Sequence, residues 1–299
     1  MVTVRAPAKL NLALAVGPPR PDGYHDVATV YHAVSLYDEV SAVEAPDGHV
    51  GVTVSGREAA GVPLGEENLA VRAARVLAKR YRILSGAALR IRKAIPAAAG
   101  LAGGSSDAAA ALVACDALWG CGATRAEMLE LAAELGSDVA FCLVGGTAIG
   151  AGRGESVHSA LARGTYRWVL AFAEHGLPTA SVYAELDRGR RSRPVAEPGI
   201  PPEVMSALRS GDADALGQVL CNDLQEPALR LRPRLRQLLA TGDERGALGS
   251  MVSGSGPTCM FLAADEEHAL DIAVHLSGAG LCRSVVRAYG PVPGARVAG

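Results

Sequence analysis

The stretch that decides the fold is IPAAAGLAGGSSDAAAALVACDALWG, residues 95–120. It starts as a glycine-containing loop and continues as an alanine-rich segment whose apolar residues recur with helical spacing. We predict a helix with its N-cap at Ser105 or Ser106 and with Asp107 in its first turn. A glycine loop that feeds a helix N-terminus gathers unobstructed backbone N–H groups at the positive end of the helix dipole. That arrangement is typical of an anion site.

This loop does not match the two common nucleotide-binding patterns. The P-loop pattern GxxxxGK[ST] is absent from the chain. Gly100, Gly103 and Gly104 lack the G-x-G-x-x-G spacing of a dinucleotide site, and residues 119–122, where the acidic residue of such a site would fall, contain none. A dinucleotide-binding oxidoreductase is therefore disfavoured, whereas a helix with a merely flexible glycine cap stays open.

Upstream of this loop, residues 9–16 predict a strand that carries two polar side chains. Leucines and a valine occupy alternate positions, so Lys9 and Asn11 project together from the opposite face. Residues 17–23 contain three prolines and an Asp-Gly pair and predict a loop, with Tyr24 and His25 at its exit.

The rest of the chain alternates predicted strands and helices. We expect an exposed segment at 188–202 and a domain boundary near residue 160, giving domains 1–160 and 161–299. Asn68 and Ser137 are candidate N-caps of two of the helices. The expected strands are 30–43, 50–54, 89–91, 168–173, 260–262 and 284–288, and the expected helices are 68–81, 127–135, 137–146 and 267–276.

Composition limits the possible partners and the compartment. The 299 residues are 49% hydrophobic with a formal net charge of −2, which excludes a disordered chain and disfavours nucleic acid or an anionic membrane as a partner. The six cysteines are scattered and form no metal-binding spacing, so we expect a cytoplasmic protein. A monomer or a weak homodimer is expected separately. Only Lys9, Lys79 and Lys93 are lysines among 29 basic residues, so each is a candidate for chemistry that arginine cannot perform.

Three motifs together resemble the GHMP kinases. They are RAPAKLNLAL at residues 5–14, PAAAGLAGGSSDAA at 96–109 and SGSGPT at 253–258. PDGYHDVATVYHAVSLYDEV at 21–40 and GSDVAF at 136–141 narrow the resemblance to the branch that phosphorylates the 2-hydroxyl of a cytidine-diphosphate-linked methylerythritol in the non-mevalonate isoprenoid pathway. The resemblance implies an α+β fold, with an N-terminal ribosomal-protein-like βαβ domain and a C-terminal ferredoxin-like α/β sandwich.

The resemblance also implies roles for individual residues. Lys9 and Asp138 match the family's catalytic pair, ATP is the phosphoryl donor, and Mg²⁺ is expected with Ser106 as a possible ligand. The implied substrate-binding residues are Asn11, Tyr24, His25, Thr179 and Tyr183. The implied ATP-binding residues are Pro96, Ala97, Ala98, Ala99, Gly100, Leu101, Ala102, Gly103, Gly104, Ser105 and Ser106.

Two residues depart from the family pattern. Ala102 interrupts the glycines of the loop, and Ala140 stands where relatives have proline. A methyl group at position 102 matters if the backbone there has positive φ or touches phosphate. Homoserine kinase, phosphomevalonate kinase and a non-catalytic ligand sensor of the same family remain alternatives. The presence of both Lys9 and Asp138 argues against the sensor.

Overall fold

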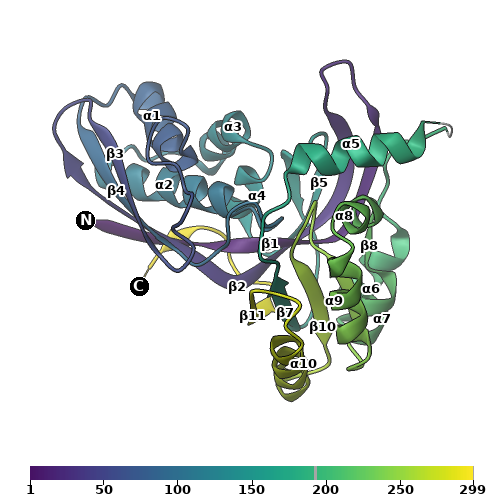
Figure 1. The fold of residues 1–299 in the computed structure, drawn as a ribbon. Coiled ribbons are helices and arrows are strands. Elements are labelled where there is room, and N and C mark those ends of the chain that lie inside the picture. The colour runs from purple at the N-terminus through teal and green to yellow at the C-terminus, as the bar shows by residue number, and fades with distance from the viewer. Residues whose placement is uncertain (192–193, 299) are drawn as a thin grey trace.

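A long β-hairpin spans the molecule. The computed structural model describes residues 1–191 and 194–298, and its two longest strands are β1 (Val2–Pro19) and β2 (His25–Ala45), which pair antiparallel (Figure 1). β1 continues past Gly17 and ends with Pro19 opposite His25, so the prediction of a loop from residue 17 was wrong. The pairing register shifts between Val16 and Pro19, and prolines are tolerated at such an irregularity in a strand. The actual turn is residues 20–24.

The larger sheet is built on this hairpin. Its order is β12-β1-β2-β4-β3, with β5 also pairing with β2, β6 with β5, and β8 with β1. Two of these strands come from far along the chain. The C-terminal β12 pairs with the start of β1, and β8 pairs with the second half of β1. The added strands are β3 (Val50–Gly56), β4 (Gly86–Lys93), β5 (Thr147–Ala151), β6 (Ser156–Ser159), β8 (Cys221–Asn222) and β12 (Arg296–Val297).

Four helices accompany this sheet. α2 (Gly103–Trp119) packs on β1 and β2, and its buried alanines allow close approach to the strands. α1 (Leu69–Tyr81) packs against α2 and is capped by Asn68, as predicted. α3 (Arg125–Leu135) begins with a capping box at Thr124, and α4 (Val139–Val144) follows it.

The predicted caps of α2 and α4 were wrong. α2 begins at Gly103, and the residue before it, Ala102, lies in the left-handed region with no side-chain cap. Ser106 is fully buried and donates its hydroxyl proton to the carbonyl of Pro7, which leaves it unavailable as an N-cap. α4 likewise has no side-chain cap, and its N-cap position is Asp138 rather than Ser137.

A second, antiparallel sheet forms the other lobe. Its order is β11-β7-β10-β9, from β7 (Tyr166–Phe172), β9 (Gly249–Val252), β10 (Cys259–Ala263) and β11 (Ser284–Gly290). α9 (Arg234–Asp243) and α10 (Glu266–Gly278) cover one face of it. The helices α5 (Thr179–Arg190), α6 (Pro202–Ser210), α7 (Ala213–Val219) and α8 (Gln225–Leu231) complete this lobe.

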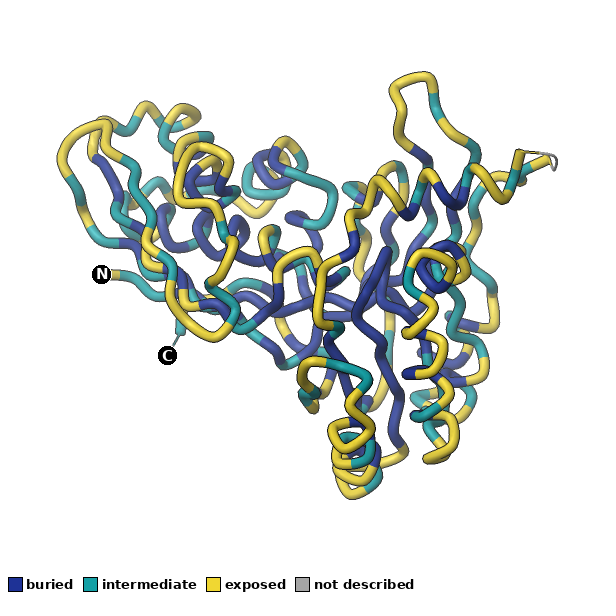
Figure 2. Tube along the Cα trace, in the orientation of Figure 1, coloured by how far each residue is buried: buried dark blue, intermediate teal, exposed yellow. Residues whose placement is uncertain are grey.

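The two lobes share a hydrophobic core. The inner face of β7, with Trp168 and Leu170, packs in one buried cluster with Leu10 and Leu12 of β1. Figure 2 shows the chain coloured as buried through the centre of the molecule, where the two lobes meet. The opposite face of β7, with Val169, packs in the cluster under α9 and α10. The predicted boundary near residue 160 lies in the loop between β6 and β7. Residues from both sides of this boundary pack in one core cluster, so the division into domains 1–160 and 161–299 stays a prediction. The expected α+β class is confirmed.

No helix in residues 1–191 or 194–298 combines the length and apolar character needed to cross a membrane.

A buried ionic cluster holds both ends of the first glycine loop, residues 96–106. Lys93 at the end of β4 donates to Asp38 of β2 and to Asp107 of α2, the latter at 2.7 Å. Asp38 also accepts backbone N–H groups of Ala94 and Ile95 at 2.6 and 2.9 Å. The cluster therefore attaches the residues just before the loop and just after it to one another and to strand β2.

The two carboxylates of this cluster are not equivalent. Asp38 accepts bonds from Lys93 and from two backbone amides, whereas Oδ1 of Asp107 is buried with no partner in the described chain. Burial and the nearby Asp38 charge raise the pKa of Asp107 well above its usual range. Burial by itself would lower the pKa of Lys93, but the two carboxylates raise it above its ordinary value.

We predict that Asp38→Asn destabilises the protein far more than Asp107→Asn. An amide at position 38 has only one acceptor oxygen, so its NH₂ group must face either the Lys93 ammonium or the two backbone donors. We expect Asp38→Asn to lower the free energy of unfolding by about 3 kcal/mol, as for a broken buried ion pair, and Asp107→Asn by less than about 1 kcal/mol. Urea denaturation followed by circular dichroism measures both, and equal losses would contradict the assignment.

Candidate active site

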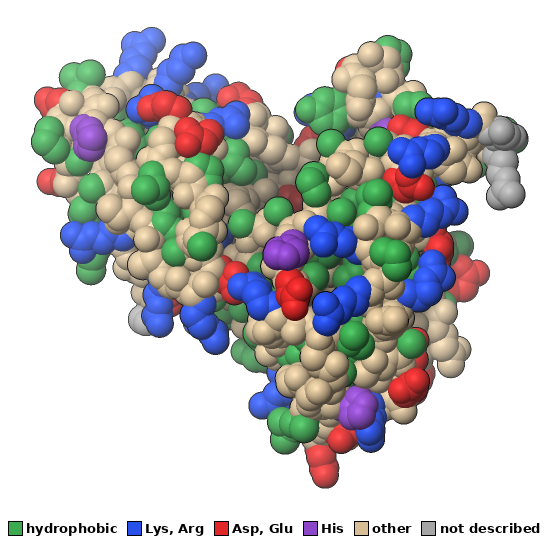
Figure 3. All heavy atoms as spheres, in the orientation of Figure 1, with side chains coloured by type: hydrophobic (Ala, Val, Ile, Leu, Met, Phe, Trp, Pro, Cys, Tyr) green, Lys and Arg blue, Asp and Glu red, His purple; other side chains and the backbone are tan. Residues whose placement is uncertain are grey.

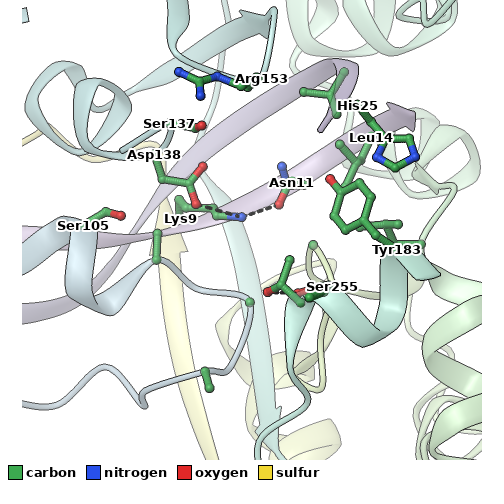
Figure 4. A pocket seen from close by; sticks show the side chains of 18 of the residues that line it. Lys9, Asn11, Leu14, His25, Ser105, Ser137, Asp138, Arg153, Tyr183 and Ser255 are labelled. Carbon is green, nitrogen blue, oxygen red and sulfur yellow. Dashed lines mark hydrogen bonds and ion pairs between the residues drawn. The ribbon is translucent and has the colours of Figure 1, made fainter. Parts of the chain in front are cut away.

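A cavity of about 750 Å³ lies between the two lobes, where the hairpin, the first glycine loop and α5 meet. Figure 3 shows the molecular surface hollowed between the lobes, and Figure 4 shows the side chains that line this hollow. The polar lining residues come from elements far apart in sequence: Lys9, Asn11, Tyr24, His25, Tyr31, Ser105, Ser137, Asp138, Arg153, Thr179, Tyr183, Asp187 and Ser255.

Lys9 is held by a chain of hydrogen bonds that starts from the backbone. The backbone carbonyl of Ala13 accepts from Thr29, whose Oγ1 accepts from Nδ2 of Asn11 at 2.7 Å. This orients the amide so that its Oδ1 accepts from Lys9 Nζ at 2.6 Å (Figure 4). Lys9 is only 5% exposed. Its ammonium is therefore fixed at the cavity wall beside Asn11, on the strand face that the two residues were predicted to share.

Asp138 lies opposite Lys9, at the start of α4. Its Oδ2 is 3.8 Å from Lys9 Nζ, and its Oδ1 accepts from the Tyr31 hydroxyl at 3.0 Å. Burial and the Asp138 charge raise the pKa of Tyr31 well above its ordinary value, so this phenol stays protonated and donates. The Tyr31 ring stacks on Phe141 with centroids 4.8 Å apart. The Asp138 side chain is 29% exposed and can reach a ligand in the cavity.

The two glycine loops contact one another at the cavity floor. Gly100 has φ +76°, and a Cβ there would lie 2.2 Å from the carbonyl oxygen of Ser253 in the second glycine loop, residues 253–258. Gly254 has φ +56°, and its Cβ would lie 3.2 Å from Lys9 Nζ. Gly100 therefore requires glycine for conformation and for space, and Gly254 favours glycine because of its positive φ and its close approach to Lys9. The close fit places backbone of both loops next to Lys9.

The first glycine loop presents most of its residues to the cavity. Pro96, Ala97, Leu101 and Ser106 do not line it, and the buried Ser106 hydroxyl is bonded to backbone. The neighbouring Ser105 lines the cavity instead. The loop residues that line it are Ala98, Ala99, Gly100, Ala102, Gly103, Gly104 and Ser105.

The predicted base-binding residues gather at the other end of the cavity. The ring of His25 lies 5.1 Å from that of Tyr183, tilted by 39°. Tyr24 is 56% exposed at the hairpin turn, and the Arg153 guanidinium lies 5.2 Å from its ring centroid. Thr179 at the start of α5 bonds Ser255 at 2.9 Å, which ties the helix to the second glycine loop.

Sequence reasoning missed Tyr31, Arg153 and Asp187. Tyr31 stands in a run of strand residues, Arg153 lies between two glycines, and Asp187 is one charge among several on α5. No local pattern distinguishes them, because each acquires its contact only through the tertiary fold. Lys93 carried one signal, its rarity as a lysine, which singled it out without indicating its partners.

Comparison with known proteins agrees with this geometry. The model of the GHMP kinases N terminal domain matches residues 68–146, and that of the GHMP kinases C terminal domain matches residues 204–280. 4-Diphosphocytidyl-2-C-methyl-D-erythritol kinase of Thermobifida fusca is 53% identical over 99% of this chain and 98% of its own length. The chain belongs to the GHMP kinase family. The protein of the same name from Leifsonia xyli is 54% identical, also over 99% of this chain and 98% of its own.

Solved structures support the same membership. A crystal structure of 4-(cytidine 5'-diphospho)-2C-methyl-D-erythritol kinase superposes with a TM-score of 0.79, at 32% identity over 96% of this chain and 98% of the other. A homoserine kinase from Cytophaga hutchinsonii superposes at 0.76 with 19% identity, covering 99% and 97% of the two chains, which shows a shared fold. The GHMP fold expected from the motifs is confirmed.

The two departures from the family pattern have different structural consequences. Ala140 is in the first turn of α4, where a backbone N–H has no partner within the helix, so alanine and proline both fit. Ala102 has φ +59°, a left-handed conformation that alanine adopts at a cost of about 1–2 kcal/mol.

We predict that Ala102→Gly stabilises the protein slightly. Relief of the left-handed strain exceeds the extra backbone entropy of glycine, so the free energy of unfolding should rise by about 0.5 kcal/mol. The matched control is Ala133→Gly inside α3, which should lose about 1 kcal/mol. Chemical denaturation compares the two. If Ala102→Gly loses as much as the control, strain at residue 102 is not a significant contribution to stability.

Proposed function

We propose that this chain transfers the terminal phosphoryl group of ATP to the 2-hydroxyl of 4-diphosphocytidyl-2-C-methyl-D-erythritol. The products are the 2-phosphate and ADP, a step of non-mevalonate isoprenoid synthesis. The observation that carries the proposal is the position of the Lys9–Asp138 pair in one cavity, between a glycine loop on one side and an aromatic cluster on the other. Full-length relatives above 50% identity carry that activity in their names.

ATP is assigned to the first glycine loop. This loop opens α2, and it lines the cavity with backbone that carries small side chains. Backbone N–H groups and the helix dipole favour a bound polyphosphate there. The chain is nearly neutral overall, so binding of a polyanion depends on such local groups. The ionic cluster around Lys93 holds the two ends of this loop and so stabilises its conformation.

Asp138 and Lys9 are assigned to the chemistry. Asp138 accepts the proton of the substrate hydroxyl as its oxygen attacks phosphorus, and its other oxygen stays oriented by Tyr31. Lys9 provides a positive charge beside this carboxylate and the reacting oxygens. Because Asn11 holds the ammonium, little reorganisation is needed when charge moves.

The cytidine end of the substrate is assigned to the aromatic cluster. Tyr24 and Tyr183 are assigned to stack their rings on the base, and His25 is assigned to hydrogen-bond the edge of the base. Arg153 lines the cavity near Ser137 and Asp138 (Figure 4), and its guanidinium lies 5.2 Å from the Tyr24 ring centroid. Its positive charge is therefore assigned to the substrate diphosphate. Thr179 adds a hydroxyl at the start of α5.

Mg²⁺ fits this site as an ion carried mainly by the nucleotide. The described residues contain no group of three acidic, histidine or cysteine side chains able to hold a metal. Asp138 and Ser105 line the cavity with oxygen atoms, and Mg²⁺ commonly keeps its waters and phosphate ligands with one or two protein oxygens. When bound, the ion neutralises charge on the phosphates.

A substrate panel tests the activity. ADP release is measured with 4-diphosphocytidyl-2-C-methyl-D-erythritol, homoserine, phosphomevalonate and galactose at equal concentration. We expect turnover with the first substrate and no release above background with the others. Turnover of another substrate in preference would replace the proposed function, and no turnover with any would favour a ligand-sensing role.

The roles of the catalytic pair predict the behaviour of two variants. Asp138→Asn and Lys9→Ala should each lower kcat by about 10²–10⁴-fold, with the Kd for ATP changed by only a few-fold, because neither residue belongs to the glycine loops. The matched controls are Lys79→Ala, at an exposed residue of α1, and Asp214→Asn, at an exposed residue of α7, and both should retain full activity. Calorimetry and initial rates provide both measurements. Near-normal kcat in either variant removes that residue from the mechanism.

A further inference from the structure

Asp187 contacts the ring of His25 in the aromatic cluster. Its Oδ1 lies 2.9 Å from Nε2 of His25. The histidine side chain is only 5% exposed, whereas that of Asp187 is 40% exposed at the cavity edge. Tyr183 precedes Asp187 by one helical turn on α5, so one face of the helix presents both to His25. The histidine is therefore held by a ring contact and by a carboxylate.

α5 itself is anchored to the hairpin. Arg190 near its end donates to the backbone carbonyl of Val16 at 2.7 Å and to Asp223 at 2.8 Å. Asp223 also accepts the backbone N–H of Val16. These bonds join α5 to β1 beyond the cavity. The position of Asp187 relative to His25 is consequently set by the fold as well as by their own contact.

The carboxylate determines which nitrogen of His25 carries the proton. An ionised carboxylate can only accept, so Nε2 of the neutral ring must be the donor. Nδ1 then has a free lone pair. In the part of the chain that the structure describes, Nε2 is the His25 ring nitrogen with a hydrogen-bond partner, and His25 lines the cavity. Nδ1 is thus left as an acceptor for a ligand.

We infer that Asp187 is a positioning residue that makes the site select cytosine over uracil. Cytosine carries an amino donor where uracil carries a carbonyl acceptor. An acceptor at Nδ1 pairs with the amino group, but it places lone pair against lone pair when uracil binds. A site that leaves a buried polar group unpaired rejects that ligand strongly. This inference rests on the proposed function, because it places the base of the substrate against His25.

The test compares the cytidine-linked substrate with its uridine-linked analogue. We measure kcat/KM for both at pH 8 with saturating ATP, and expect the wild-type chain to prefer the cytidine substrate by tenfold or more. Asp187→Asn should reduce this preference about tenfold, since an amide can either accept from Nε2 or donate to it and so permits both tautomers. Its kcat with the cytidine substrate should stay within a few-fold of wild type.

Two further variants separate tautomer control from a general structural effect. Asp187→Glu keeps a carboxylate and should retain the preference. Glu185→Gln removes one negative charge from the same helix, at a residue paired with Arg188 and Arg230 rather than with His25. This variant should also retain the preference for the cytidine substrate. A loss of preference in Glu185→Gln equal to that in Asp187→Asn would overturn the inference.

A spectroscopic measurement checks the tautomer without any substrate. Two-bond ¹H–¹⁵N spectra of the histidine rings should show His25 protonated at Nε2 in the wild type and in mixed tautomers in Asp187→Asn. Protonation at Nδ1 in the wild type, or an undiminished preference in Asp187→Asn, would overturn the inference. Failure of the wild type to phosphorylate the cytidine substrate would instead contradict the proposed function, and the spectrum would still report on the contact between Asp187 and His25.

Discussion

The ionic cluster of Lys93, Asp38 and Asp107 is the interaction on which the site depends. A segment made of loop residues 96–102 and the first turn of α2 cannot be held by its own backbone bonds if most of its backbone amides are to stay free for a ligand. Its two ends are instead fixed by one ammonium between two carboxylates, one on the central strand β2 and one on α2. The cluster is buried, so its geometry is specific, because a charge displaced from its partner in this environment is expensive.

The hairpin of β1 and β2 organises the rest of the site. Lys9 and Asn11 come from β1, Tyr31 from β2, and His25 from the start of β2 just after the turn. Both faces of the hairpin are largely covered, one by α2 and the other by the second sheet. A strand buried on both sides can hold a charged side chain at a fixed position, provided that its charge is compensated. Asn11 and Asp138 provide that compensation for Lys9.

Much of the fold and part of the site could be predicted from local patterns. The cap of α1 at Asn68 follows from residue type, and periodicity predicts strands at 50–54 and 89–91, which the structure extends to 50–56 and 86–93. The joint projection of Lys9 and Asn11 follows from strand alternation. The start of α2 could not be predicted in this way, because Ser106 satisfies its hydroxyl on Pro7, a residue 99 positions away. Its preference for an N-cap was overridden by that distant carbonyl.

The sequence by itself determined which chemical groups were available: a glycine loop before a helix, a lysine on a strand, an aspartate before a short helix, and an aromatic residue beside a histidine. Tertiary structure alone decided which of them meet. The contacts between His25 and Asp187, Tyr31 and Asp138, and Lys93 and Asp38 join residues 162, 107 and 55 positions apart. Periodicity specifies the face of an element on which a side chain lies, but its partner depends on how elements pack, and packing is decided by the whole core.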